Sequence, residues 1–347
     1  MFREAKYLAA YLIPLATALG LLLGGPWTWA TPVLAFGLVP LAEALLGENP
    51  ANDAPPSEAA RRVYDWLLYL NVPLLWTLLL TTLWQLTHQP LPAWQQAGLV
   101  VSTGITVGAL GVNVGHELGH RSTPYEKALA HLQLISALFL HFYIEHNRGH
   151  HRFVATPRDS ATARRGEGFY AFLLRAVPGE IRSAFQLEAD RLRRRGLPAW
   201  SLRNDLLLYL LLETAFLIIL GFAFGPAGVA WFLAIATVGV LLFQIVDYVE
   251  HYALLRQEIA PGIFERVRPC HSWNADYVLG RLMLYELTRH SDHHYQPARK
   301  YQLLRHLDPS PQLPAGYPAM MLLALVPPLW RRIMAPRAEA AARLTTP

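Results

Sequence analysis

The sequence predicts an all-α, polytopic membrane protein with six transmembrane helices and a helical cap on the cytoplasmic side. Of the 347 residues, 53% are hydrophobic and only 16% are charged, whereas a soluble domain usually carries about a quarter charged residues. The apolar residues form long uncharged runs, and the charge is concentrated in residues 120–203 and 250–310. This distribution excludes a disordered chain and favours one membrane-embedded domain, residues 1–347, with a polar face.

Six runs are long enough to cross a bilayer, because about 20 residues at 1.5 Å each span roughly 30 Å of hydrocarbon. The run near the N-terminus follows a positively charged start, but it is longer than the apolar part of a signal peptide, so we interpret it as an anchor. We place the spans at residues 7–24, 28–46, 65–86, 94–115, 205–224 and 228–249.

Positive charge sets the expected orientation. Arg3 and Lys6 precede the first span and Arg61 and Arg62 precede the third, whereas the connections 24–27, 87–93 and 225–227 contain no Lys or Arg. By the positive-inside rule, both termini and the polar segments 116–203 and 250–335 face the cytoplasm. The formal net charge of +5 is therefore interpreted as membrane topology, and no nucleic acid is expected as a partner.

Histidine is the unusual residue of this chain, with 14 copies against a single cysteine. Eight histidines fall in three clusters and a ninth, His251, follows Glu250 near the end of the sixth span. Imidazole is a ligand that suits Fe, Zn, Cu and Ni, and nine nitrogens fit two ions better than one zinc, which takes about four ligands. The clusters are His116-Glu-Leu-Gly-His120, His146-Asn-Arg-Gly-His150-His151 and His290-Ser-Asp-His293-His294.

Helical spacing predicts which histidines share an ion. Residues three or four apart lie on one face of a helix. We therefore expect His146 and His150 to point at one ion, as His116 and His120 do, with His151 turned toward a neighbour. The cluster from 290 to 294 repeats that arrangement.

All nine histidines must lie on one side of the membrane to share a site. Residues 128–144 form a seventh apolar stretch between the first two clusters. If that stretch crossed the bilayer, the clusters would lie about 25–30 Å apart. We therefore predict that it returns to the cytoplasmic side, either along the interface or after dipping into the membrane.

Two other functions share part of this pattern. The first cluster satisfies the HExxH motif of zinc metalloproteases, with Glu117 as general base, but that function leaves seven histidines unused. A metal transporter is expected to carry its ligands near the bilayer midplane, whereas here they gather at one end of the spans.

The clusters and their neighbours resemble the integral-membrane alkane 1-monooxygenases, a family within the histidine-rich membrane di-iron group of fatty acid desaturases and xylene monooxygenase. The resemblance continues through residues 154–157, 271–274 and 313–318 and covers roughly 35–335. The chain departs from the family at Ala253, where glycine is usual. The matching motifs are Gly115-His-Glu-Leu-Gly-His120, Ile144-Glu-His-Asn-Arg-Gly-His-His151, Asp247-Tyr-Val-Glu-His-Tyr252 and Arg289-His-Ser-Asp-His-His294.

The resemblance implies two Fe ions and the terminal hydroxylation of n-alkanes to 1-alkanols with O2 and two electrons. A terminal C–H bond offers no handle for acid–base chemistry, so a metal–oxygen species is needed. The alternatives within the same group are a fatty acyl desaturase or hydroxylase and a xylene-type methyl monooxygenase. The implied ligands are His116, His120, His146, His150, His151, His251, His290, His293 and His294.

The resemblance also implies electron delivery by rubredoxin and, through it, a flavin-dependent rubredoxin reductase. One cysteine cannot form the four-cysteine site of rubredoxin, so we expect a separate acidic chain that docks on the arginine-rich cytoplasmic face. The expected location is the inner membrane of a bacterium. A lipid-dissolved alkane would enter a tunnel between the spans. The small residues Ala35 and Gly37 suit such a tunnel, although they suit simple helix packing as well.

Six carboxylates are candidates to orient the imidazoles through their far nitrogens, although each suits a helix cap or a surface charge as well. Glu213, within the fifth span, is expected to bond polar groups of another span such as Asn71 or Asn113. The other five histidines, at 88, 131, 141, 271 and 306, are not expected to bind metal, and residues 336–347 are expected to be a loose tail. The six carboxylates are Glu117, Glu145, Asp159, Asp247, Glu250 and Asp292.

Overall fold

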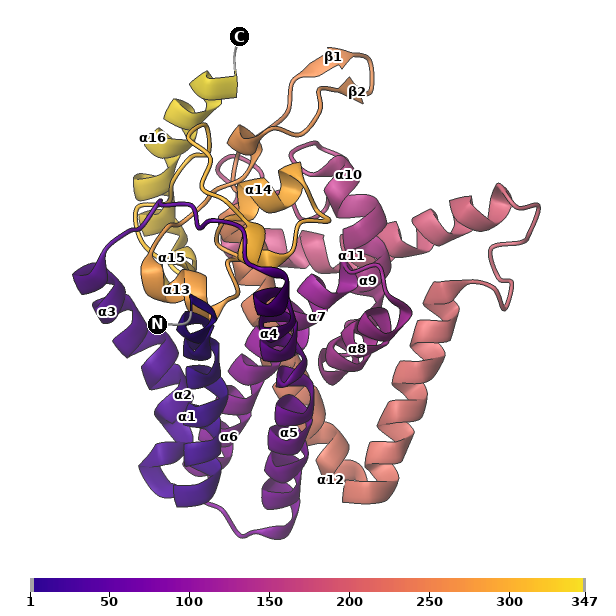
Figure 1. The fold of residues 1–347 in the computed structure, drawn as a ribbon. Helices are drawn as coiled ribbons and strands as arrows, with labels where there is room; N and C mark the ends of the chain where they lie inside the picture. Colours follow the sequence, from indigo (N-terminus) through magenta and orange to yellow (C-terminus); the bar gives the residue numbers. More distant parts are fainter. Residues whose placement is uncertain (1–2, 346–347) are drawn as a thin grey trace.

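The computed structural model describes residues 3–345, and most of them are helical (Figure 1). Within this range, five helical segments are long and apolar enough to cross a membrane. Apart from Gly24 they contain all six predicted spans, so the predominantly helical, membrane-embedded architecture is confirmed. The five segments are Arg3–Leu23, Gly25–Leu46, Glu58–His88, Ala93–Gly119 and Asp205–Glu250.

The last of these segments, α12 (Asp205–Glu250), contains two of the predicted spans. Its 46 residues measure about 69 Å at 1.5 Å per residue, roughly twice the hydrocarbon thickness. At Gly225 the backbone leaves the helical region, with φ 70° and ψ 180°, and Pro226 follows. The chain reverses there, as Figure 1 shows, because glycine adopts a positive φ without steric cost.

The first four segments are each assembled from shorter helices. Two of them contain a turn of π-helix, in which hydrogen bonds join residues five apart: η3 in the second and η4 in the fourth. The bounds are η1 (Arg3–Tyr11), α1 (Leu12–Leu23), η2 (Gly25–Trp29), α2 (Ala30–Val33), η3 (Leu34–Leu38), α3 (Val39–Leu46), α4 (Glu58–Tyr69), α5 (Asn71–His88), α6 (Ala93–Thr106), η4 (Val107–Val112) and α7 (Asn113–Gly119).

Glycines four residues apart let the fourth segment lie close to α12. A Cβ atom on Gly104 would stand 2.4 Å from the Cβ of Val238, and one on Gly108 would stand 2.6 Å from Leu242. Small residues at this spacing are typical of helix contacts in membranes. The fourth segment ends in the first histidine cluster and α12 ends at Glu250, so this packing aligns two parts of the site.

The seventh apolar stretch folds back instead of forming a long helix. It contains α8 (Pro124–Leu134), η5 (Ile135–Ala137) and α9 (Leu140–Glu145), and the chain turns at Leu138, where φ is 50°. The amide of Leu140 donates to Glu213 Oε1 at 2.9 Å. Glu213 therefore caps this turn and does not bond Asn71 or Asn113, whose amides donate to Tyr285 and to Leu284.

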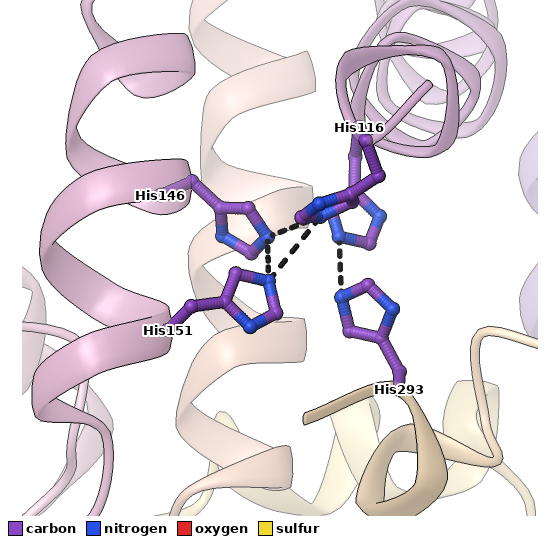
Figure 2. A group of neighbouring side chains, drawn as sticks. His116, His146, His151 and His293 are labelled. Atoms are coloured by element: carbon purple, nitrogen blue, oxygen red, sulfur yellow. Dashed lines mark hydrogen bonds between the residues drawn. The ribbon is translucent and has the colours of Figure 1, made fainter. Parts of the chain in front are cut away.

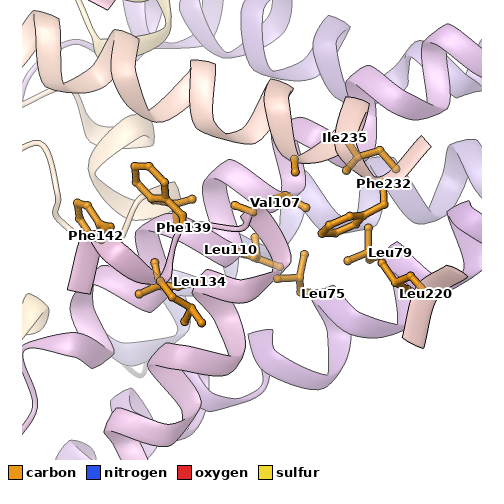
Figure 3. Packing of buried hydrophobic residues seen from close by; sticks show 14 of the residues in the cluster. Leu75, Leu79, Val107, Leu110, Leu134, Phe139, Phe142, Leu220, Phe232 and Ile235 are labelled. Carbon is orange, nitrogen blue, oxygen red and sulfur yellow. The ribbon is translucent and has the colours of Figure 1, made fainter. Parts of the chain in front are cut away.

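The largest apolar cluster joins the spans to this returning segment. Leu75, Leu110, Leu134 and Phe232 pack together in it, with Phe142 at one end (Figure 3). The ring of Phe142 stacks on His146 with their centroids 4.6 Å apart. The core therefore fixes the second histidine cluster by direct contact.

Two longer helices, α11 and α16, together with short helices and loops form the remainder of the chain at one end of the spans (Figure 1). A small antiparallel hairpin, β1 (Glu258–Ala260) with β2 (Ile263–Phe264), projects from it. The helices are η6 (His146–His150), α10 (His151–Phe153), α11 (Phe169–Arg193), η7 (Pro269–His271), α13 (Val278–Met283), α14 (His290–Tyr295), η8 (Tyr301–Leu303), α15 (Tyr317–Ala324) and α16 (Pro327–Thr345).

The expectation of a loose tail was wrong for residues 336–345, which belong to α16; residues 346 and 347 lie outside the described residues. Trp330, Met334, Ala338 and Ala341 are buried against the cap. Their spacing of three or four residues places them on one helix face. This apolar stripe holds the end of the chain in place.

Candidate metal centre

The nine clustered histidines meet in two neighbouring groups. In each group, one ring nitrogen from every residue lies within 4.8 Å of the others. We call the groups the five-histidine group and the four-histidine group; Figure 2 shows most of the former. The five-histidine group is His116, His120, His146, His151 and His293, and the four-histidine group is His150, His251, His290 and His294.

A π-helical turn assigns the second cluster to the two groups. In η6 the hydrogen bonds join residues five apart, and the Nε2 atoms of His146 and His151 lie 2.9 Å from each other. His150 points to His294 of the other group, with its Nε2 3.2 Å away. This differs from the expected pairing of His146 with His150, because that expectation assumed a regular α-helix.

The third cluster divides in the same way. His290 and His294, one α-helical turn apart on α14, bring their Nε2 atoms to 2.9 Å. His293 faces the five-histidine group, where its Nε2 lies 3.0 Å from that of His116. One short helix therefore supplies ligands to both groups.

The five-histidine group contains a triangle that hydrogen bonds cannot satisfy. The Nε2 atoms of His120, His146 and His151 lie 3.1, 3.2 and 2.9 Å from one another. Each neutral nitrogen either carries a proton or a lone pair, so at least two of the three are of the same kind and repel each other. A cation among them accepts all three lone pairs at once.

The spacing of these nitrogens also fits a metal ion. Two nitrogens bound at about 2.1 Å to one ion and at right angles to each other are about 3.0 Å apart. Burial, together with the neighbouring imidazoles, lowers the pKa of His120 to about 3 and the pKa values of His146 and His151 well below the usual range. These rings are therefore neutral at neutral pH and present lone pairs.

The four-histidine group forms a buried chain of nitrogens. His150 lies next to His294, His294 next to His290, and the Nε2 of His290 is 3.0 Å from that of His251. Burial lowers the pKa values of His251, His290 and His294 well below the usual range. The residues of this group therefore also fit a metal ion.

Asp159 contacts the Nδ1 atom of His150, the ring nitrogen that points away from the other histidines. His150 Nδ1 donates to Asp159 Oδ2 at 3.1 Å. Burial by itself raises the pKa of Asp159, but His150 and the hydroxyl of Thr162 lower it below its usual value. The ionised carboxylate fixes the ring of His150 with Nε2 toward the other ligands, as such carboxylates do in metal sites.

Three of the other candidate carboxylates contact other groups. Glu117 pairs with Arg121 at 2.7 Å and accepts from the amide of Tyr301, and Asp292 pairs with Arg299. Glu145 accepts from Ser183 Oγ at 3.2 Å. Burial, and then the charge of the nearby Asp159, raises the pKa of Glu145.

Glu250 and Asp247 lie beside the four-histidine group. Together with His251 they place potential ligand atoms within 4.8 Å of one another. Glu250 Oε2 is 3.3 Å from the Nε2 of His290, which is the nitrogen that faces the other histidines. Glu250 therefore meets His290 on the ligand side and not at the far nitrogen.

The remaining five histidines lie outside both groups. His131 contacts the hydroxyl of Tyr209 at 2.8 Å, His271 lies 3.3 Å from Glu265, and His306 pairs with Asp276. His88 contacts Thr87 and His141 packs edge-on against Phe139.

Tyr317 is a residue of the site that the sequence analysis did not identify. Its hydroxyl donates to Glu250 Oε1 at 2.8 Å, and the side chain is fully buried. The only sequence signal was its position within the matching stretch 313–318. Its contact is 67 residues away along the chain, so local spacing could not reveal it.

An apolar cavity leads from the spans to both histidine groups. At its polar end lie His116, His146 and His290, with Asp247 and Glu250. Elsewhere the walls are mostly aliphatic and aromatic and come from α1, η3, α3, α6, η4, α12, α13 and α15. Ala35 lines this cavity and Gly37 does not, so one of the two small residues contributes to it.

The two groups differ in exposure. His120 and His151 of the five-histidine group are half-buried, whereas all members of the four-histidine group are buried. The side of the centre that faces solvent is thus defined by two ligands from different helices, α10 and the end of α7.

Comparison with known proteins agrees with this architecture. A family model described as fatty acid desaturase matches residues 92–324. Alkane 1-monooxygenase 2 of Pseudomonas aeruginosa is 40% identical, over 98% of this chain and 94% of the relative.

Two further relatives extend the comparison. Alkane 1-monooxygenase of Ectopseudomonas oleovorans is 40% identical over 87% of this chain and 76% of its own length. The xylene/toluene monooxygenase hydroxylase component XylM of Pseudomonas putida is 30% identical over 94% of this chain and 87% of its own length. The expected resemblance is confirmed: the chain belongs to the alkane 1-monooxygenase family of membrane oxidoreductases, whose histidine motifs form the two groups described above.

Proposed function

We propose that this protein hydroxylates the terminal carbon of n-alkanes to 1-alkanols with O2 and two electrons, at a centre of two Fe ions held by the nine histidines. The observation that carries the proposal is the apolar cavity that ends at His116, His146 and His290, members of both histidine groups. Relatives named alkane 1-monooxygenase that match most of the chain support the substrate class.

Each part of the site has a role in this reaction. The bound irons would supply the activation of O2 that the strong C–H bond requires. The neutral imidazoles provide the lone pairs, and Asp159 orients one of them. The apolar cavity walls bind the hydrocarbon chain by burying its surface and exclude water from the reacting end.

We also propose that both arms of α12 cross the bilayer, giving six crossings, with the cap in the cytoplasm of a bacterium and the spans in its inner membrane. The reversal at Gly225 and the apolar character of α12 support two crossings. The arginines of residues 121–203 and the charged termini support the orientation.

A separate rubredoxin, reduced by a flavin-dependent reductase, is the proposed electron donor. The one cysteine of this sequence, Cys270, cannot form the four-cysteine iron site of rubredoxin. The half-buried His151 is followed by Arg152, an exposed arginine whose guanidinium lies 5.0 Å from the ring of Phe153. An acidic protein attracted to this surface would approach the five-histidine group.

The geometry argues against the zinc protease. Glu117, the general base of that function, is paired with Arg121 and bonded to the backbone of Tyr301. Its two flanking histidines meet three more from other segments. The relatives named for alkanes are 36–40% identical to this chain, against 30% for XylM, which favours alkanes over xylenes.

The test combines product and metal analysis. The purified protein is incubated with rubredoxin, its reductase, NADH and n-alkanes of graded length, and the products are separated by gas chromatography. We expect 1-alkanols and about two irons per chain, as nine nitrogen ligands imply. One zinc per chain, or hydroxylation with NADH but without rubredoxin, would contradict the proposal.

A further inference from the structure

The end of α12 brings a carboxylate oxygen in among the ligand nitrogens. Glu250 is 1% exposed, and its Oε2 lies 3.3 Å from the Nε2 of His290. The same nitrogen lies 3.0 Å from the Nε2 of His251 and 2.9 Å from that of His294. Three nitrogens and one oxygen thus converge on one small volume.

A second residue holds this carboxylate in position. Tyr317 donates to Oε1 of Glu250 at 2.8 Å, so Oε2 is directed toward His290. The backbone is fixed as well, because the amide of Trp273 donates to the Glu250 carbonyl oxygen at 2.9 Å. The position of Oε2 is therefore determined by two contacts outside the histidine group.

In the proposed two-iron centre, a hydrogen bond does not account for the position of Oε2. If Nε2 of His290 binds a metal ion, it has no proton to donate to the carboxylate. A carboxylate oxygen next to an unprotonated nitrogen would then meet a lone pair and be repelled. A cation that both atoms bind removes the repulsion and explains why the two atoms face each other.

We propose that Glu250 is an oxygen ligand of the metal ion held by His150, His251, His290 and His294, with Tyr317 as its positioning residue. The inference rests on the proposed two-iron centre. Histidine together with a carboxylate is a ligand set that iron uses in other non-haem sites. A buried carboxylate also reduces the net charge of the buried ion and its ligands, which lowers the cost of burying that charge.

The consequence is that the two irons are inequivalent. One is surrounded by nitrogens of the five-histidine group, and the other by nitrogens and an oxygen. Asp247 lies one helical turn before His251 and lines the cavity, but Glu250 is the carboxylate that the structure holds against a ligand nitrogen. We therefore assign the oxygen ligand to Glu250.

The test is Mössbauer spectroscopy of the diferrous protein purified with iron-57, combined with iron analysis. The variants are Glu250→Gln, Glu250→Ala and Tyr317→Phe. The matched control is Glu180→Gln, at a carboxyl group that is also fully buried on α11 but accepts hydrogen bonds from Gln244 at 3.1 and 2.9 Å instead of facing a histidine.

We expect two quadrupole doublets from the native protein and from Glu180→Gln. In Glu250→Gln one doublet shifts while the other is unchanged, and in Glu250→Ala iron falls from about two toward about one per chain. Tyr317→Phe shifts the same doublet by less. If the Glu250 variants do not accumulate as folded protein, the shift of that doublet in Tyr317→Phe tests the assignment, and an unshifted doublet would contradict it.

Two different failures can be told apart. Unchanged doublets and iron content in the Glu250 and Tyr317 variants of a two-iron protein would overturn only the role of Glu250. A native protein that does not hold two irons would overturn the proposed centre and this inference together.

Discussion

The two histidine groups use the same side chain but differ in their surroundings. The five-histidine group contacts solvent through His120 and His151. The four-histidine group is buried, and Asp159 and Glu250 contact two of its rings. The difference teaches that nine identical side chains can form two unlike groups, one open to solvent and the other in contact with buried carboxylates.

The largest expected effect on activity comes from removing one proposed ligand, in separate variants, from each group. We expect His293→Ala and His150→Ala each to lower hydroxylation by more than about a hundredfold, because removing a ligand costs at least as much as removing the residue that orients it. His293→Ala should remove iron from the five-histidine group first, and His150→Ala from the other. Iron analysis and alcohol formation from n-octane check this, and full activity of either variant would contradict the assigned ligands.

The next effect concerns the carboxylate that orients a ligand. Asp159→Asn keeps the shape of the side chain but removes the charge that holds His150, so we expect iron affinity to fall by about 10- to 100-fold. Asp292→Asn is the control, because Asp292 pairs with Arg299 and Arg305 and not with a clustered histidine. Competition with a chelator measures both affinities. Equal losses in the two variants would show that Asp159 acts through general stability.

Charge reversal at Arg152 tests the solvent-exposed surface beside the five-histidine group. We expect Arg152→Glu to raise the KM for rubredoxin by roughly threefold to tenfold at low salt and by less at high salt, because it repels an acidic partner beside His151. Arg337→Glu on α16 is the control, since it reverses another exposed arginine. Steady-state kinetics at two ionic strengths measure the KM for rubredoxin in both variants. An equal rise of KM in both would show that only the net charge of the protein matters and would contradict docking beside His151.

A pH effect is expected at Glu180, which lies near the buried side of the centre. Burial raises its pKa to about 8, and the charge of Asp159 contributes. Since the folded state keeps this proton while an unfolded chain releases it above about pH 4.5, its stabilising contribution declines as pH rises from about 5 to about 8. We expect Glu180→Gln to flatten this decline. Melting temperatures of native protein and variant across that range are the measurement, and parallel curves would contradict the assignment.

The smallest effect is expected at Ala253, two residues after His251. The backbone there has a φ of 61°, a conformation that costs about 1–2 kcal/mol for residues other than glycine. We expect Ala253→Gly to raise the free energy of unfolding by about 1 kcal/mol after the entropy of glycine is deducted. Ala163→Gly, at a buried alanine without a positive φ, should lower it. Unfolding in detergent compares the two.

The sequence predicted the features that depend on local composition. The spans follow from runs of apolar residues, and the returning segment at 128–144 follows from the need to keep the clusters on one side. The break at Gly225 lies in the predicted connection 225–227. These inferences need only chain length, charge and the thickness of a bilayer.

Features that depend on helix register and distant contacts were not predictable. The π-helical turn at η6 pairs His146 with His151, and no residue type marks such a turn. Tyr317 reaches Glu250, and Leu140 reaches Glu213, across 67 and 73 residues. Such contacts are set by tertiary packing, which a single sequence does not display.

The close approach of three ring nitrogens, from His120, His146 and His151, affects how the protein folds. Without a cation, at least one of the three contacts between them is repulsive, and this repulsion opposes the docking of α7 against η6 and α10. In the proposed two-iron centre, metal binding then helps to assemble these helices, since binding free energy at such sites is also folding free energy. We therefore expect a cell starved of that metal to insert the spans normally and to accumulate a chain whose histidine-bearing helices stay unassembled and exposed to proteases until the metal arrives.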